Sequence, residues 1–511
     1  MVISNKWKRL LFSIICCVCV GILVHGFFIS NKFYNHDDIF NMLQAQDLTS
    51  SGRWLLHISM AIESFSISTP WFSAMLGFLY IGIAIYLICE IFSIHHILQI
   101  LAIASVMLTW VSLSATLLYT KFFSPYMFAF LLMHLALYLA LQKNWALPLA
   151  VLAMVLSLAC YQAYVGFYVG LCTLYFMQYC LKKGFDKALF LKMLKVILVF
   201  VLAMILYISI TKILLNKQSL NAAYQGVDTM GTFTIESLFT GIGRAYTEFY
   251  QQFLGEEAVI FPEIMKPFII VYLCLLLLWF IHSLFGKSIL QVVAVGFAAF
   301  LLPLAFSIFH VMGIADIHVL IRYSNVLYFL MPLLFIDGWR KYSPLQKIIK
   351  FGMALLVSVL VFCNLQSISS TNMALYLAQK QADAYTSRLL LRIESTPGFE
   401  SYDRVVFIGK SSLGGELEQL LSQTNFHSIA VSEISAPNMY SADKYINYFQ
   451  GFYNFIYPVD SIDEMHSIKA LQAVLTDELV ESLQAMPVYP SDGSIVRNEN
   501  GFVFVKLSEE Y

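Results

Sequence analysis

Charged residues are scarce in this sequence. Only 12% of its 511 residues are Asp, Glu, Lys or Arg, whereas 59% belong to the apolar set AVILMFWYC. Soluble globular chains are about a quarter charged and about 45–50% apolar. The composition therefore excludes an ordinary soluble enzyme, and a net charge of −1 disfavours nucleic-acid binding. It predicts an α-helical polytopic membrane protein that contacts the lipid bilayer.

Cysteine motifs that bind metal are also missing. All nine cysteines lie in apolar stretches, none follows Cys363, and no CxxC or Cys/His spacing offers a metal site. Free cysteine in apolar surroundings behaves as a small hydrophobic residue. The sequence therefore predicts no metal site and no cofactor. The adjacent aspartates Asp37 and Asp38 leave open whether a divalent cation takes part.

The two ends of the chain differ in charge. Residues 1–369 contain 22 basic and 14 acidic residues, whereas residues 370–511 contain 9 basic and 18 acidic residues. This asymmetry predicts two domains, a basic membrane domain over 1–369 and an acidic tail domain over 370–511.

Long apolar runs fill the first domain. A helix needs roughly 20 apolar residues to cross about 30 Å of hydrocarbon. On that criterion the sequence predicts about 11 transmembrane helices, near 9–29, 70–90, 97–118, 126–142, 145–160, 163–181, 194–214, 267–285, 288–310, 321–337 and 348–367.

Basic residues set the expected orientation, because they collect on the cytoplasmic side. With a cytoplasmic N-terminus, 14 of the first 22 basic residues fall at the N-terminus or in inner loops, against three acidic residues. The long segments 30–69 and 215–266 and the tail 370–511 are then extracytoplasmic. Most polar surface lies on that side, so chemistry is expected there.

The tail alternates helical and strand-like patterns. We expect a helical stalk over 372–394 and strands over Arg404–Ile408 and Gly501–Leu507. A helix over Gly415–Gln423 and a strand over Ser428–Val431 are expected between them. The tail is therefore predicted to be a C-terminal extracytoplasmic α/β domain.

The first outer loop contains the strongest catalytic candidates. Asp37 and Asp38 are adjacent carboxylates near the membrane surface, where charge is costly unless it is solvated, paired or used. Such a pair can accept a proton from a hydroxyl, or it can begin a helix as a capping residue. Trp54 and Glu63, from the same loop, are candidates for sugar or acceptor contacts.

Four basic residues are candidates for binding a donor phosphate: Arg53, Lys121, Arg322 and Arg244. Arg binds phosphate through two parallel hydrogen bonds. Arg at a membrane interface also contacts lipid headgroups, and this alternative is strongest for Arg244, on an expected amphipathic helix over 241–250.

A polar group between two apolar runs contains Tyr161 and Gln162. These residues either contact a sugar or end two helices. A loosely spaced cluster of His310, Asp316 and His318 is a further candidate for binding a cation.

The basic N-terminus, one span and an outer loop with an Asp pair followed by Ser51–Gly52–Arg53–Trp54 resemble the Gtr family of serotype-converting O-antigen glucosyltransferases, type II branch. The ending from Met486 to Leu507 is also similar to that family's tail. The resemblance implies a GT-C membrane glycosyltransferase of the bacterial inner membrane. It implies transfer of glucose from undecaprenyl-phosphate-glucose to O-antigen on the periplasmic face, alongside a separate flippase and a donor-making glucosyltransferase.

On this interpretation one residue of the Asp pair is the base, and basic side chains stabilise the leaving phosphate in a single inverting displacement. The same chemistry with another sugar or acceptor, such as teichoic acid or lipid A, stays open, and so do two other functions. One is a polysaccharide polymerase with a diphosphate-linked donor. The other is a transporter or flippase of lipid-linked sugars, which would place charged residues in the middle of spans.

Overall fold

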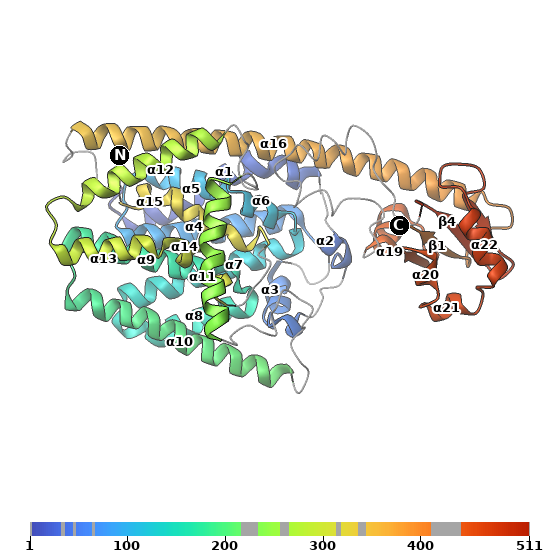
Figure 1. Ribbon diagram of the computed structural model, residues 1–511, viewed down its shortest axis with the longest axis horizontal. Coiled ribbons are helices and arrows are strands. Elements are labelled where there is room, and N and C mark those ends of the chain that lie inside the picture. The colour runs from blue at the N-terminus through green and yellow to red at the C-terminus, as the bar shows by residue number, and fades with distance from the viewer. Residues whose placement is uncertain are drawn as a thin grey trace. The chain divides into compact units, whose positions relative to one another are not determined.

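A computed structural model describes residues 3–31, 36–43, 48–63, 67–215, 234–255, 265–312, 318–335, 344–409 and 441–509. The chain divides into two compact units (Figure 1). The first, here called the membrane unit, consists of Met1–Lys32 and Leu43–Ser369. The second, the C-terminal unit, consists of Phe33–Met42 and Ser370–Tyr511.

The described part of the membrane unit is built from helices joined by short turns. They are α1 Lys6–Asn31, η1 Thr49–Ser51, α3 Leu56–Glu63, α4 Pro70–Phe92, α5 Ile97–Leu108, α6 Val111–Leu117, α7 Thr120–Gln142, η2 Asn144–Ala146, α8 Leu147–Cys160, η3 Gln162–Tyr164, α9 Val165–Lys183, α10 Lys187–Leu215, α11 Ile235–Phe253, α12 Lys266–Leu284, α13 Ile289–Phe300, α14 Leu302–Phe306, η6 Ile308–His310, η7 Ile321–Val326, α15 Leu327–Phe335 and the first part of α16 Pro344–Glu394.

The chain is a polytopic helical membrane protein. Within the described residues, seven helices are long and apolar enough to cross a membrane, and an eighth span results if the pair α5 and α6, bent by 60°, counts as one. Shorter apolar helices occupy Leu147–Cys160, Ile289–Phe300 and Ile321–Phe335, where three further spans are predicted. The predicted break at Tyr161–Gln162 is confirmed, because η3 separates α8 from α9 there. The count of eleven crossings stays a prediction.

Small residues allow the central helices to approach closely. A Cβ on Gly82 of α4 would lie 2.7 Å from Cα of Ile14 in α1, and a Cβ on Gly77 would overlap the Phe123 ring of α7. Interfaces with small residues are typical of helix packing in membranes, where dispersion contacts replace the hydrophobic effect. Arg9, one of the basic residues at the N-terminus, is buried and donates to Glu90 at the end of α4, with Nε–Oε1 at 3.0 Å.

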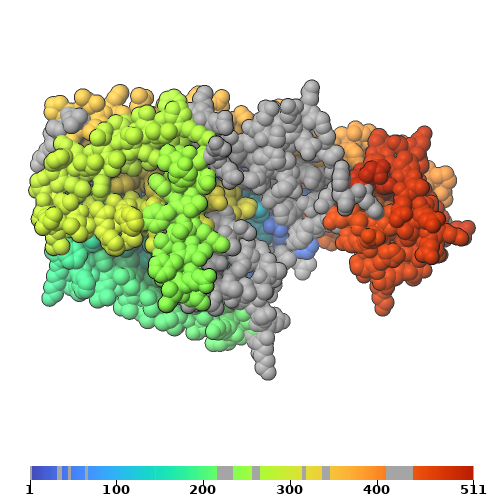
Figure 2. Space-filling model, viewed as in Figure 1, coloured from blue at the N-terminus to red at the C-terminus, as the bar shows by residue number. Residues whose placement is uncertain are grey.

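The outer helices present apolar side chains. α10, α12 and α13 form one side of the membrane unit in the space-filling view (Figure 2), and their exposed residues include many large Leu, Ile, Val and Phe side chains. A surface of this kind suits lipid contact. In Figure 1, α11 runs across these helices, as expected for the amphipathic helix predicted over 241–250.

The C-terminal unit contains a four-stranded sheet. Its strands are β1 Arg404–Ile408, β2 Ile456–Val459, β3 Ile495–Arg497 and β4 Phe502–Lys506, in the order β2-β1-β4-β3. β1 pairs in parallel with β2 and β4, and β3 pairs antiparallel with β4. The central strands β1 and β4 are apolar over Val405–Ile408 and Phe502–Val505, because both faces of the sheet are covered.

Each face has its own core. The C-terminal part of α16, with α19 Ala442–Tyr445 and the following π-helix Ile446–Gln450, packs on one face. On the other face lie α20 Ile462–Met465, α21 Lys469–Gln472 and α22 Asp477–Ala485.

Two strands of the tail lie where the sequence predicts them. β1 coincides with the expected strand Arg404–Ile408, and β4 falls within Gly501–Leu507. The expected stalk over 372–394 is the end of the single helix α16. The expected helix over 415–423 and strand over 428–431 lie outside the described residues, and the sequence did not predict β2 or β3.

One segment does not follow the predicted domain boundary. Helix α2, His36–Phe40, comes from the first outer loop, which the sequence assigned to the membrane domain. In the structure, Phe33–Met42 belongs to the C-terminal unit instead. Asp37 and Asp38 therefore belong to the C-terminal unit.

Candidate functional site

The loop Ser51–Trp54 has a tightly defined backbone. The 3-10 helix η1 ends at Gly52, which has a φ of 75° in the left-handed region that favours glycine. The Gly52 N–H donates to the Thr49 carbonyl at 2.9 Å, and the Arg53 N–H donates to the Leu48 carbonyl at 3.1 Å. These bonds fix the direction in which the Arg53 side chain leaves the loop.

Two side chains from other helices hold this loop in place. Gln162 Nε2 donates to the Ser51 carbonyl at 3.2 Å and to the Tyr207 hydroxyl at 2.8 Å. The Tyr207 hydroxyl, from α10, donates to the Gly52 carbonyl at 3.1 Å. Gln162 therefore uses its amide to position the loop, which gives it a structural task besides the sugar contact predicted for it.

Arg53 lies among aromatic rings. Its guanidinium carbon is 5.0 Å from the centre of the Tyr161 ring, and one guanidinium nitrogen is 3.4 Å from the Tyr126 hydroxyl. The Tyr126 and Tyr161 rings stack with centroids 3.9 Å apart. Tyr161 is only 5% exposed, so its ring supports Arg53 and has little surface left for a sugar. A cation over an aromatic face is stabilised by the ring quadrupole.

Trp54 adds an unsatisfied donor next to Arg53. The indole Nε1 is buried and has no hydrogen-bond partner among the described residues. Buried indole N–H groups are normally paired. We call Arg53, Trp54, Tyr126, Tyr161, Gln162 and Tyr207 the Arg53 cluster.

A Gly52→Ala substitution tests whether the loop geometry matters. A Cβ on Gly52 would overlap the Tyr207 hydroxyl and lie 3.0 Å from Gln162 Nε2, so the loop must shift. We expect the activity of the protein to fall on the order of 10²-fold, as for a 1 Å misplacement of a group that acts on a substrate. Gly286→Ala is the matched control: its φ is 73° and nothing lies within 4 Å of the new Cβ. It costs about 1–2 kcal/mol of stability from φ alone. Equal activities of the two variants would contradict a role for the loop.

A buried carboxylate and a buried lysine lie together at the start of α7. Glu63 accepts hydrogen bonds from the Ser124 hydroxyl at 2.9 Å and from the Thr69 hydroxyl at 3.1 Å. Burial raises the pKa of Glu63, and these hydrogen bonds and the charge of Lys121 oppose the rise only in part. Lys121 is 1% exposed. The structure thus brings together Glu63, a predicted sugar contact, and Lys121, a predicted phosphate contact.

Arg322 belongs to a second buried ionic group. Glu248 of α11 forms an ion pair with Arg322, whose Nε lies 3.0 Å from Glu248 Oε1, and Glu248 Oε2 lies 2.6 Å from His310 Nε2. Burial raises the pKa of Glu248, but the His310 hydrogen bond and the Arg322 charge outweigh burial, so the pKa is lowered overall. Gly241 allows α11 to approach this group, because a Cβ there would lie 2.8 Å from the His310 carbonyl carbon.

The remaining predicted basic residue and the predicted cation cluster lie elsewhere. Arg244 is on the exposed side of α11, consistent with the headgroup alternative. His310 is engaged by Glu248, and Asp316 lies outside the described residues. In the part of the chain that the structure describes, there is no group of three or more His, Cys, Asp or Glu side chains that could hold a metal ion.

The predicted catalytic pair lies in the other unit. Asp37 and Asp38 are in the first turn of α2. Asp38 is 0% exposed, whereas Asp37 is partly exposed. The Asn41 backbone N–H and its side-chain Nδ2 both donate to the Asp37 carbonyl, at 2.9 and 2.8 Å. Asp37 is therefore the member of the pair with surface available to a substrate.

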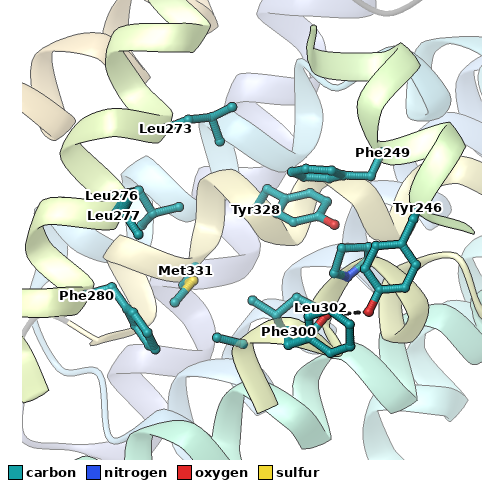
Figure 3. A pocket seen from close by; sticks show the side chains of 12 residues that line it. Tyr246, Phe249, Leu273, Leu276, Leu277, Phe280, Phe300, Leu302, Tyr328 and Met331 are labelled. Carbon is teal, nitrogen blue, oxygen red and sulfur yellow. Dashed lines mark hydrogen bonds between the residues drawn. The ribbon is translucent and has the colours of Figure 1, made fainter. Parts of the chain in front are cut away.

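An apolar cavity of about 350 Å³ lies among α11 to α15 (Figure 3). Tyr246 and Phe249 of α11 line one side with Tyr328, and Leu276, Leu277, Phe280 and Met331 line another. The Tyr246 hydroxyl is engaged by the Phe300 carbonyl at 2.7 Å. Leu277 and Phe300 are 57% and 63% exposed, so the cavity lies at the apolar surface of the unit.

These features define a class: a polytopic helical membrane protein with buried cationic groups and an apolar cavity in its membrane unit. The chain belongs to the glucosyl transferase GtrII family, whose sequence model matches residues 26–335. It is therefore a membrane glucosyltransferase. No curated protein and no solved structure matches the chain.

The match contains every predicted site residue, from Asp37 to Arg322, and confirms the type II resemblance. It ends before the tail segment Met486–Leu507, for which similarity was also expected.

Sequence reasoning missed three residues of these groups: Tyr126, Tyr207 and Glu248. The two tyrosines sit within apolar runs, where nothing in the local pattern separates them from core aromatics. Glu248 had a detectable signal, because Gly241, Ala245, Glu248 and Gln252 recur at helical spacing on one face of this amphipathic helix.

Proposed function

We propose that this glucosyltransferase moves glucose from undecaprenyl-phosphate-glucose to a sugar of the O-antigen of lipopolysaccharide. The apolar cavity at the surface of the membrane unit is the observation that supports a donor with a lipid chain. Its 12 lining residues include Leu, Phe, Met, Ala, Pro and Tyr side chains and no charged one. A soluble sugar nucleotide gains nothing from such a surface, whereas an isoprenoid chain buries apolar area there. A cavity of this size takes the first few isoprene units, and the rest of the chain lies in the bilayer.

Cationic groups near this cavity suit the donor phosphate. Phe249, which lines the cavity, directly follows Glu248 in α11, and Glu248 forms an ion pair with Arg322. η7, which contains Arg322, packs against η3, which contains Gln162 of the Arg53 cluster. In the proposal the phosphate lies toward Arg322 and Arg53, and both stabilise charge on the departing phosphate.

The proposed chemistry is a single displacement. Asp37 accepts the proton of the acceptor hydroxyl as its oxygen bonds to the anomeric carbon of glucose. The bond from that carbon to the phosphate oxygen breaks, leaving undecaprenyl phosphate. Attack from the face opposite the leaving group inverts the anomeric centre. This scheme follows the GT-C pattern and uses side chains alone to offset the phosphate charge.

We further propose an eleven-span arrangement in the bacterial inner membrane. The N-terminus is cytoplasmic and residues 370–511 are periplasmic. The excess of basic residues in the predicted inner loops supports this orientation. The donor then comes from a separate donor-making glucosyltransferase through a flippase.

The test is transfer by the full-length protein reconstituted in liposomes. Undecaprenyl-phosphate-glucose with labelled glucose and purified O-antigen should give labelled polysaccharide, and UDP-glucose should give none. If labelled lipid moves across the bilayer and no labelled polysaccharide forms, the result would contradict the proposed enzyme and indicate a transporter. Extension of the polysaccharide from a diphosphate-linked repeat would replace it with a polymerase.

Narrowing the cavity tests the donor's lipid. Ala299→Phe adds a ring to a cavity-lining position, so we expect KM to rise about tenfold for undecaprenyl-phosphate-glucose. A donor with a single isoprene unit should be affected less than twofold. Val293→Phe is the control, since Val293 is also on α13 but is not among the residues that line the cavity. Equal sensitivity of both donors would contradict an isoprenoid in this cavity.

A further inference from the structure

The placement of α2 links the Asp pair to the C-terminal unit. Although α2 comes from the first outer loop, residues Phe33–Met42 cluster with Ser370–Tyr511. The GtrII family match ends at residue 335, so it includes α2 but none of the segment Ser370–Tyr511 on which α2 packs. The C-terminal unit therefore contacts part of the matched region directly.

Ile39 makes the contact. It is 7% exposed and belongs to the apolar core on the α16 face of the sheet, together with Ala382, Tyr445 and Ile446. Helix α2 packs against α19, which ends at Tyr445. The Tyr445 hydroxyl donates to Asp383 Oδ1 of α16 at 2.5 Å. The helix against which α2 packs, α19, is therefore joined to α16 by a hydrogen bond.

Helix α2 depends on this surface for its conformation. It has five residues, and isolated helices shorter than about 12 residues are marginal in water. Ile39 follows Asp37 by two residues, which places the two side chains about 200° apart around the helix. Burial of Ile39 thus turns Asp37 toward the opposite side, in agreement with its partial exposure.

We propose that the C-terminal unit positions the catalytic base of this enzyme. Ile39 is a positioning residue: its insertion into the α16-face core fixes α2 and so fixes the carboxylate of Asp37. Asn41 contributes from within the segment, because it is 0% exposed and binds the Asp37 carbonyl twice. The inference rests on the proposed role of Asp37 and adds a function for the C-terminal unit within the reaction.

The experiment compares Ile39→Ala with Ile462→Ala in the full-length enzyme. Ile462 is 1% exposed in the core on the other face of the same sheet, where it does not meet α2. We expect Ile39→Ala to lower kcat on the order of 10²-fold, with KM for the lipid donor within about twofold of wild type. Ile462→Ala should keep kcat within about threefold, and the conservative Ile39→Val should recover most of the activity.

Three results would overturn the positioning role. They are equal losses of kcat in Ile39→Ala and Ile462→Ala, unchanged kcat in Ile39→Ala, and a change confined to KM. An Asp37→Asn variant separates this failure from that of the proposed base. If Asp37→Asn is inactive while Ile39→Ala is fully active, only the positioning role fails. If Asp37→Asn is fully active, the proposed base itself fails.

Discussion

Replacing Asp37 with Asn is expected to lower kcat for glucosyl transfer by about 10²–10⁴-fold, the usual contribution of a positioned general base. The substitution keeps the size and hydrogen-bonding shape of the side chain but removes its ability to accept a proton. Binding of the lipid donor should persist, since the predicted phosphate contacts Arg53, Lys121 and Arg322 are unchanged. Single-turnover transfer from labelled donor, with donor binding measured separately, gives both quantities.

Two further variants make this result specific. Asp463→Asn makes the same chemical change at an exposed residue of α20 and should leave kcat within about twofold. Asp38→Asn should act on stability, because Asp38 is fully buried and offers no surface to an acceptor hydroxyl. Its melting temperature should fall while kcat changes less than tenfold. Loss of kcat in a stable Asp38→Asn variant, with Asp37→Asn active, would transfer the role of base to Asp38.

The sequence predicted a polytopic helical membrane protein with long apolar helices, because hydropathy is a local property. The break at Tyr161–Gln162 and the strand Arg404–Ile408 were also visible as local changes in residue type. Stacking of Arg53 on Tyr161 was not visible, since it depends on how α7, η3 and the loop Ser51–Trp54 meet in space. A contact between two segments that are distant in the sequence cannot be recognised from the residues of either segment alone.

The location of α2 shows the same limit more clearly. Asp37 and Asp38 stood out as charges near the membrane surface, and that observation alone favoured neither catalysis nor capping. Only the structure separates the two residues by exposure and assigns their helix to the C-terminal unit. Ile39 gave no signal of its own, because a single isoleucine in a short segment has no period to compare.

Arg53 should discriminate between the donor and the product by their charge. The donor is a phosphodiester with one negative charge, whereas undecaprenyl phosphate is a monoester that carries about −1.5 to −2 at pH 7. Electrostatic attraction to a fixed cation grows with the charge of its partner. Arg53→Gln is therefore expected to weaken product inhibition more than donor binding, raising the Ki of undecaprenyl phosphate about tenfold more than the KM of the donor.

The same variant should lower kcat by about 10²–10³-fold, as for loss of one preorganised donor to a developing negative charge. Arg53→Lys keeps the charge but loses the planar group that lies over Tyr161, so it should restore product inhibition more fully than kcat. Initial rates at several concentrations of added undecaprenyl phosphate give Ki, KM and kcat together. If Arg53→Gln raises Ki and KM by the same factor, Arg53 does not contact the phosphate, and its place over Tyr161 serves to hold the loop Ser51–Trp54.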